Sequence, residues 1–343
     1  MTWLETLLWP FSVPYGAGAY LRARAYRTGL LKPKRLDGFV ISVGNLTVGG
    51  TGKTPMTLWI AERLASEGKR AGILTRGYQG HSPESGDEVK LLRGRLADRV
   101  AIGAGSDRFG SGLELQQQGV EWFVLDDGFQ HVQLERDVNI VLVDATRPFG
   151  GGHVLPAGRL REPRSALGRA NIVIITRSSH APAVEATVRR FTAAPIFYAQ
   201  THLDAIRRFH PGQGGEEVSP QAAGPVFAFC AIGNPPAFLE DLRGWGIHVA
   251  GHRFFRDHHR FTKRDLARIQ QEAEATGAQA LICTEKDLYN LDTAADIEWP
   301  VYSCAISMTV ERAGEFWGLV QEIARSRHNS KARRASAGAV ANR

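Results

Sequence analysis

Apolar runs alternate with helical patterns along the first half of the chain. Leu58, Ala61 and Leu64 recur at helical spacing and predict a helix over 54–67. Continuous apolar runs that helices separate are typical of parallel strands buried on both faces. We therefore expect an α/β fold with a mostly parallel sheet flanked by helices. Its predicted strands are 39–43, 71–74, 122–125, 140–144 and 172–176.

The hydrophobic pattern resumes after a stretch rich in Gly, Pro and Glu at 211–220, which predicts a loop or a domain boundary. Beyond it we expect strands at 226–231, 280–283 and 301–306 and helices at 236–243 and 263–275. These elements predict a second, smaller α/β domain. The expected segments are an N-terminal helical segment (1–36), a larger core (37–210), the smaller domain (221–325) and a disordered basic tail (326–343).

Charge and cysteine content narrow the class of protein. The net charge of +7 over 343 residues comes from the two ends: 1–36 and 324–343 each hold six Lys or Arg. The remaining residues are mildly acidic, which argues against a nucleic-acid binder. The three cysteines are far apart and form no CxxC pair, which fits buried thiols in a reducing compartment.

A glycine-rich loop follows the first predicted strand and precedes the first predicted helix. Residues 44–54 read GNLTVGGTGKT, close to the phosphate loop GxxxxGK[ST], although Thr47 replaces its first glycine. Glycines let backbone N–H groups close around a phosphate. Lys53 supplies a positive charge, and Thr54 a hydroxyl for Mg²⁺. A glycine-rich turn without a ligand is the alternative, but the flanking strand and helix favour nucleotide binding.

Paired carboxylates end the predicted strand at 122–125. Asp126 and Asp127 stand where a strand of a P-loop protein holds Mg²⁺. Two adjacent aspartates after a strand often only form a turn. The glycine-rich loop at 44–54 is what favours a magnesium site here.

Several motifs together resemble one family. They are VGNLTVGGTGKTP (43–55), GDE (86–88), GSDR (105–108), LDDGFQH (125–131), LPAGRLREP (155–163), DHH (257–259) and TEKD (284–287). This set resembles the tetraacyldisaccharide 4′-kinases of Gram-negative bacteria, which are P-loop lipid kinases. The resemblance implies ATP- and Mg²⁺-dependent phosphorylation of the 4′-hydroxyl of a tetraacyldisaccharide 1-phosphate, a lipid A precursor. It also implies a peripheral location on the cytoplasmic face of the bacterial inner membrane.

The resemblance also implies roles for individual residues. It places ATP on Thr47, Val48, Gly49, Gly50, Thr51, Gly52, Lys53 and Thr54. It places Mg²⁺ near Thr54, Glu162 and the pair Asp126 and Asp127, either of which is a candidate for direct contact with the metal. It places the substrates near Arg108, Gln130, His131 and Arg161. Asp87 is then the base beside the acceptor hydroxyl, and His258 is its partner. A contact between Asp87 and His258 would require the second domain to close over the first.

The N-terminal segment has the pattern of a helix at a membrane surface. Apolar residues recur at helical spacing, and six Lys or Arg follow them by residue 35. Those apolar residues are Trp3, Leu4, Leu7, Leu8 and Phe11. The alternative is a helix packed on the protein's own core. Pro10 and Pro14 break the uncharged stretch 6–21, which is too short to span a bilayer, and we expect no signal peptide.

Two other functions compete with the lipid kinase. A membrane-associated P-loop ATPase switch would carry a signature Lys before the glycine pair, where this chain has Val48. A nucleic-acid binder would use the basic tail, but the tail lacks interleaved aromatic residues. We therefore expect the acylated disaccharide lipid and the cytoplasmic leaflet as partners, with no nucleic acid and no obligate protein partner.

Overall fold

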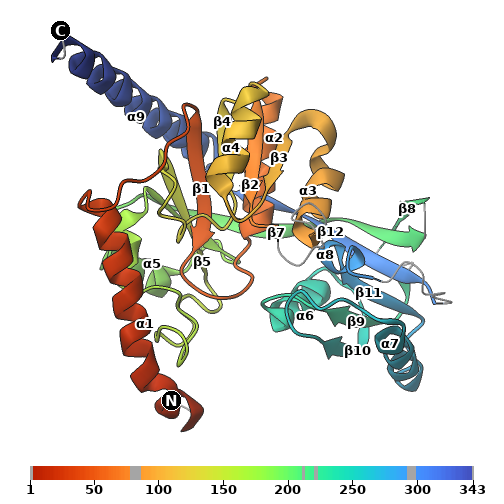
Figure 1. Ribbon diagram of the computed structural model, residues 1–343. Helices are drawn as coiled ribbons and strands as arrows, with labels where there is room; N and C mark the ends of the chain where they lie inside the picture. Colours follow the sequence, from red (N-terminus) through yellow and green to blue (C-terminus); the bar gives the residue numbers. More distant parts are fainter. Residues whose placement is uncertain (1–2, 78–85, 211–212, 220–222, 292–298, 342–343) are drawn as a thin grey trace. The chain divides into compact units, whose positions relative to one another are not determined.

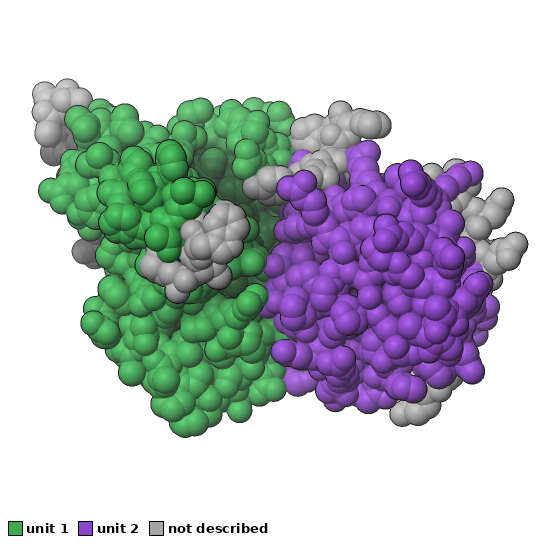
Figure 2. Space-filling model, turned by 90° about the horizontal axis from the view of Figure 1, so that it is seen from below, with its two compact units in different colours: residues 1–76, 96–201, 308–343 green, residues 77–95, 202–307 purple. Residues whose placement is uncertain are grey.

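The computed structural model describes residues 3–77, 86–210, 213–219, 223–291 and 299–341 (Figure 1). The chain divides into two compact units, which Figure 2 shows in different colours. Unit 1 comprises 1–76, 96–201 and 308–343, and unit 2 comprises 77–95 and 202–307.

Unit 1 contains a parallel sheet in the order β7–β6–β5–β1–β4–β2–β3. The strands are β1 (Phe39–Asn45), β2 (Ala71–Thr75), β3 (Ala101–Ala104), β4 (Trp122–Leu125), β5 (Val138–Asp144), β6 (Ile172–Thr176) and the first part of β7 (Ile196–His210). The five strands expected in this region are confirmed. β3 and β7 were not predicted.

Unit 1 has five α-helices in the described part of the chain: α1 (Trp3–Arg27), α2 (Lys53–Ser66), α4 (Arg108–Gln117), α5 (Pro182–Arg189) and α9 (Ala313–Ala341). Short 3₁₀ turns cover Ala97–Arg99 and Arg164–Arg169. Helix α2 confirms the helix expected at 54–67. Helix α9 continues to Ala341, where a disordered tail was expected, because Ala and Arg are strong helix formers.

The strand order of unit 1 marks where a ligand can bind. β1 pairs with β4 on one side and with β5 on the other, so the strand order reverses direction at β1. In open parallel sheets, ligands bind beyond the carboxyl ends of the strands at such a point. The glycine-rich loop leaves β1 at this position, and the Asp126–Asp127 pair leaves the adjacent β4.

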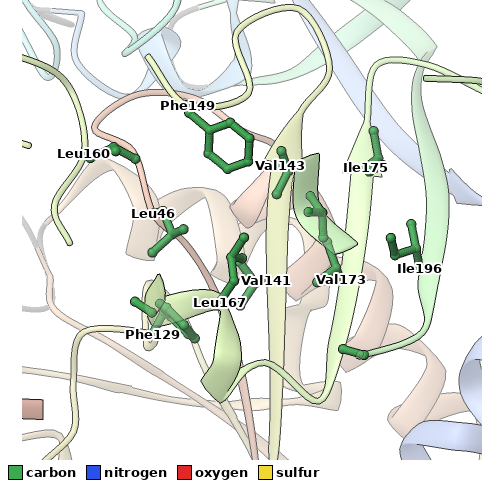
Figure 3. Close-up of a cluster of buried hydrophobic side chains, with 13 residues drawn as sticks. Leu46, Phe129, Val141, Val143, Phe149, Leu160, Leu167, Val173, Ile175 and Ile196 are labelled. Carbon is green, nitrogen blue, oxygen red and sulfur yellow. The ribbon is translucent and has the colours of Figure 1, made fainter. Parts of the chain in front are cut away.

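A buried apolar cluster supports the chain around that point (Figure 3). It joins Val141 of β5 and Val173 of β6 to Leu46, just after β1, and to Phe129, just after the aspartate pair. Gly44 permits the close packing here, since a Cβ at this position would lie 2.7 Å from both the backbone N and the Cβ of Phe129. The loop and the aspartate pair are therefore held by one core.

Unit 2 contains a smaller parallel sheet in the order β10–β9–β11–β12. Its strands are β9 (Val226–Cys230), β10 (Val249–Phe254), β11 (Ala280–Thr284) and the part of β12 (Val301–Val310) up to residue 307. Alternate residues of β9 pack under α6 (Pro235–Gly244) on one face and under α7 (Lys263–Ala275) on the other. The expected strands and helices of the second domain are confirmed, while β10 was not predicted.

Two segments differ from the sequence expectation. Residues Gln213–Val218, within the stretch expected to be a loop, form β8, which pairs antiparallel with β7. Helix α3 (Asp87–Leu96), expected inside the core at 37–210, belongs to unit 2 up to residue 95. The unit boundary falls inside β7, which runs unbroken past residue 201, so no change in composition marks it.

Candidate functional site

The glycine-rich loop ends at an uncapped helix N-terminus. Gly52 is the N-cap of α2, and it has no side chain that could accept a hydrogen bond from the first turn. Its φ of 87° is left-handed, and a Cβ there would lie 2.8 Å from Met308 Cε, so glycine is required. An uncapped N-terminus presents unsatisfied N–H groups and a partial positive charge to an anion.

Hydrogen bonds to other residues of unit 1 hold the glycine-rich loop in place. Asn45 Nδ2 donates to Thr51 Oγ1 over 2.9 Å, and Thr176 Oγ1 donates to the Thr51 carbonyl over 3.1 Å. The Val48 N–H donates to the Arg159 carbonyl over 2.7 Å. Among the residues predicted to bind ATP, Thr47 and Thr51 are buried, Gly49, Gly52, Lys53 and Thr54 are half-buried, and Val48 and Gly50 are exposed.

Lys53 lies between the loop and the aspartate pair. Its Nζ is 3.5 Å from both Asn45 Oδ1 and the Gly49 carbonyl, and 3.7 Å from Asp127 Oδ1. The structure thus brings together the lysine and the carboxylate that sequence analysis expected around the phosphates.

The two aspartates have different environments. Asp126 is 3% exposed and accepts a 3.0 Å hydrogen bond from Thr57 Oγ1. Asp127 accepts two hydrogen bonds from Arg161 Nη1, of 2.8 and 2.7 Å. Burial raises the pKa of Asp127, but Lys53 and Arg161 outweigh it and lower that pKa to about 2. Asp127 is therefore ionised at neutral pH.

Gln130 and Glu162 connect the strand ends of unit 1. Gln130 Nε2 donates to the Asn45 carbonyl over 2.9 Å and to Glu162 Oε1 over 3.1 Å. Glu162 is buried and accepts two 2.8 Å hydrogen bonds from Arg169. These contacts hold Glu162 in a buried ion pair, so its predicted role near Mg²⁺ stays a prediction.

Arg108 and His131 interact electrostatically beside the aspartate pair. Arg108 is buried at the start of α4, and its Nη1 donates to the Asp127 carbonyl over 3.4 Å. Burial and the charges of Arg108, Arg136 and Arg22 together lower the pKa of His131 to about 4. His131 is thus neutral at pH 7.

Asp87 and His258 are in contact, and both belong to unit 2. His258 Nδ1 lies 3.0 Å from Asp87 Oδ2, and Asn290 Nδ2 donates to the same oxygen over 3.0 Å. Burial raises the pKa of Asp87, but the His258 hydrogen bond and the charge of Lys286 lower it to about 2. Burial likewise lowers the pKa of His258, and the hydrogen bond to Asp87 reverses this, so the net shift is upward.

The expectation that domain closure creates this contact is wrong. Helix α3 carries Asp87 within unit 2, so the contact with His258 exists inside one unit. The sequence could not show this, because 171 positions separate the two residues.

Sequence analysis missed several residues at these sites. They are Asn45, Thr57, Arg169, Lys286 and Asn290. Helical spacing could have indicated Thr57, because it follows Lys53 by four positions on α2 and therefore shares its face. Asn45 and Lys286 stand inside the motifs 43–55 and 284–287, which could have indicated them. Arg169 and Asn290 lie outside those motifs, and Asn290 contacts Asp87 across 203 positions, which leaves no local pattern.

The donor set of unit 1 fits a magnesium ion that arrives with a nucleotide. No group of three or more His, Cys, Asp or Glu side chains in the described ranges is arranged to hold a metal. Mg²⁺ commonly uses one or two carboxylates together with phosphates and water. The carboxylates of Asp126 and Asp127 and the Thr54 hydroxyl match that requirement.

The fold and the loop of unit 1 are those of a P-loop nucleotide-binding protein. A family model described as tetraacyldisaccharide-1-P 4′-kinase matches residues 4–325. The chain belongs to this family of kinases, which confirms the resemblance that the motifs indicated.

Individual relatives agree with this assignment. The tetraacyldisaccharide 4′-kinase of Geobacter metallireducens is 37% identical over 324 residues, covering 89% of this chain and 94% of the relative. That of Pelobacter propionicus is 40% identical over 303 residues, covering 83% and 82%. The crystal structure of LpxK from Aquifex aeolicus in complex with ATP is similar with a TM-score of 0.72 and 31% identity, covering 93% of this chain and 99% of that one.

Proposed function

We propose that this protein transfers the γ-phosphoryl group of ATP to the 4′-hydroxyl of a tetraacyldisaccharide 1-phosphate, giving the 1,4′-bisphosphate in lipid A biosynthesis. Family membership supports the substrate class. The observation that carries the reaction type is the phosphate loop, with Lys53 beside Asp127 at the uncapped N-terminus of α2. Phosphoryl transfer depends mainly on positioning and charge neutralisation, which this arrangement supplies.

Unit 1 is assigned to ATP. The loop from Thr47 to Thr54 wraps the phosphates, with Lys53 neutralising the β- and γ-phosphates. Thr54, Asp126 and Asp127 would hold the Mg²⁺ that accompanies the nucleotide, and Arg169 fixes the position of Glu162. Mg²⁺, when bound, would neutralise the negative charge of the phosphates.

The roles proposed for the substrate-binding residues follow from their contacts. They are Arg108, Gln130, His131 and Arg161. Arg161 and Arg108 already contact Asp127, so they lie beside the proposed phosphate position. Gln130 spans the ends of the strands, and neutral His131 can accept or donate a hydrogen bond to a sugar hydroxyl.

Unit 2 supplies the base. The Asp87 carboxylate is ionised at neutral pH, and its Oδ1 accepts from the Glu88 N–H over 2.8 Å while Oδ2 accepts from His258 and Asn290. A carboxylate positioned in this way can take the proton of the acceptor hydroxyl, which is worth about 10²–10⁴-fold in rate. His258 keeps that carboxylate in position.

The lipid substrate requires a membrane surface, which we propose is the cytoplasmic leaflet of the bacterial inner membrane. Helix α1 exposes large apolar side chains, with Leu7 at 62% and Phe11 at 64%. Its inner side packs on unit 1, where Ser12 Oγ donates to the Val154 carbonyl over 2.9 Å. No helix in the described part of the chain is long and apolar enough to cross a bilayer. The exposed residues suit binding in the interfacial plane.

The decisive experiment follows the γ-phosphate. Purified protein is mixed with γ-labelled ATP, Mg²⁺ and the tetraacyldisaccharide 1-phosphate, and the lipids are separated by chromatography. A labelled bisphosphate lipid is expected, absent with Lys53→Ala and present with the surface control Lys69→Ala. Hydrolysis of ATP without a labelled lipid, in folded protein, would contradict the proposal and favour an ATPase switch.

A further inference from the structure

The ammonium of Lys286 lies beside Nε2 of His258, the ring nitrogen that does not face Asp87. The lysine is on α8 (Glu285–Leu288), and its side chain is 17% exposed. Its Nζ lies 3.4 Å from His258 Nε2, 3.3 Å from Glu88 Oε1 and 3.8 Å from Asp87 Oδ2. All four residues belong to unit 2.

The contact with Lys286 determines which ring nitrogen of a neutral His258 carries the proton. A lysine ammonium only donates hydrogen bonds, so it bonds to Nε2 only when that nitrogen carries no proton. The single ring proton of a neutral His258 is then on Nδ1, which faces Asp87 Oδ2 at 3.0 Å. Resting on the function proposed above, we propose that Lys286 is a positioning residue that fixes His258 in the Nδ1–H tautomer.

This arrangement decides where the substrate proton goes. With Lys286 on Nε2 and Asp87 on Nδ1, both ring nitrogens of His258 are engaged. The acceptor hydroxyl therefore gives its proton to the Asp87 carboxylate. The electron pair of the broken O–H bond forms the new bond to the γ-phosphorus, and ADP leaves with the electron pair of the old P–O bond.

The same short helix also holds the backbone of His258. Asp287, which follows Lys286, accepts a 2.8 Å hydrogen bond from the Ala231 N–H, and the Ala231 carbonyl accepts one of 3.0 Å from the His258 N–H. His258 has a left-handed φ of 62°, which a non-glycine residue adopts only under constraint. Helix α8 thus fixes the His258 ring through Lys286 and the His258 backbone through Asp287.

The carboxylates around Lys286 keep its side chain charged. Asp87 and Glu88 face it from α3. Asp257 Oδ1, in the loop that carries His258, lies 3.9 Å from the ammonium and 3.8 Å from His258 Nε2, which is longer than a hydrogen bond. Burial lowers the pKa of Lys286, but these carboxylates outweigh it and raise that pKa, so the group stays charged. Removing the ammonium also removes the charge that lowers the pKa of His258.

The test observes the tautomer directly in the full-length protein labelled with ¹⁵N-histidine. His258 is assigned by the resonance that His258→Gln removes, and its two ring nitrogens are recorded from pH 5 to 9. In the unmodified protein, neutral His258 is expected to show a protonated Nδ1 and an unprotonated Nε2. In Lys286→Met, the titration of His258 is expected to move to higher pH.

Kinetics then separate a positioning role from a structural one. Lys286→Met is expected to lower kcat by about 10–100-fold with KM for ATP within about twofold, and Lys286→Arg to recover most of the loss. Lys263→Met, an exposed lysine of α7 with the same charge change, is the matched control and should leave both unchanged.

Two results would overturn the proposal. One is a protonated Nε2 on neutral His258 in the unmodified protein, which needs no variant to fold. The other is a folded Lys286→Met with unchanged kcat and unchanged His258 titration. If the unmodified protein shows the expected tautomer but transfers no phosphate to the lipid, the proposed function fails and the tautomer assignment stands.

Discussion

At the scale of single residues, the ionised aspartates Asp127 and Asp87 differ in whether the charge of their partners changes with pH. Asp127 is held by Arg161, whose charge does not change in the physiological range. Asp87 is held by His258 and Asn290, so part of its environment changes with pH. This contrast suits the proposed tasks, because a phosphate site needs a constant charge, whereas a base acts by changing its own protonation.

The pKa of Asp127 leads to a prediction about stability. A carboxyl whose folded pKa is lowered stabilises the fold above its unfolded pKa, and that contribution disappears as pH falls from 3.8 toward 2. Asp127→Asn is therefore expected to reduce the free energy of unfolding at pH 7 by about 2 kcal/mol. Urea unfolding at a series of pH values measures this. The difference from the unmodified protein should shrink below pH 4; a constant difference would contradict the assignment.

Residue patterns predicted the phosphate site better than the Asp87–His258 pair. Lys53, Thr54 and the aspartates stand in two local motifs, each directly after a strand, so adjacent strand ends bring them together. Asp87 and His258 were assigned only through the resemblance. Asn290 gave no signal, because an asparagine in an irregular segment has no pattern that distinguishes it.

At the scale of elements, buried strands were the most predictable feature. Each expected run of apolar residues forms a strand, since the hydrophobic pattern alone requires burial. The sequence failed at β8, where Gly and Glu suggested a loop, because pairing with β7 supplies backbone hydrogen bonds that composition does not reveal. It also failed to predict that α3 joins unit 2, since only tertiary contacts such as Asp87 with His258 decide that.

Helix α1 provides a prediction at this scale. Leu7 and Phe11 lie one turn apart and are largely exposed, so Leu7→Glu/Phe11→Glu should preserve folding and remove apolar contact with lipid. Binding to vesicles of phosphatidylethanolamine and phosphatidylglycerol is expected to weaken by at least about tenfold. Flotation or sedimentation with vesicles measures this partition.

The control for α1 is Leu113→Glu, a 37% exposed leucine on α4. It adds a carboxylate to unit 1 without altering the helix, and vesicle binding should stay near that of the unmodified protein. Equal binding of all three proteins would exclude α1 as the membrane contact.

At the scale of the whole molecule, the two tasks proposed above fall in separate units. The phosphate loop belongs entirely to unit 1, and the Asp87–His258 pair entirely to unit 2. Each group is complete within its own unit, so nucleotide binding and proton removal should be separable by mutation.

Calorimetry with ATP and Mg²⁺ tests that separation. Lys53→Ala is expected to weaken ATP binding by more than about tenfold, because it removes the cation at the phosphates. His258→Ala should bind ATP within about twofold of the unmodified protein, yet lower kcat by about 10²–10⁴-fold. Loss of ATP binding in His258→Ala would show that the two tasks are not separate.

Unit 1 consists of three separate segments of the chain, so translation completes the two units in a fixed order. Its last segment begins at residue 308, and Met308 lies against the phosphate loop at Gly52. Trp317 of α9 donates to Glu67, just after α2. A ribosome therefore finishes every residue of unit 2 before it supplies the final segment of unit 1. Although its sequence motif precedes unit 2 in the chain, the nucleotide site is completed only when the segment that begins at residue 308 emerges.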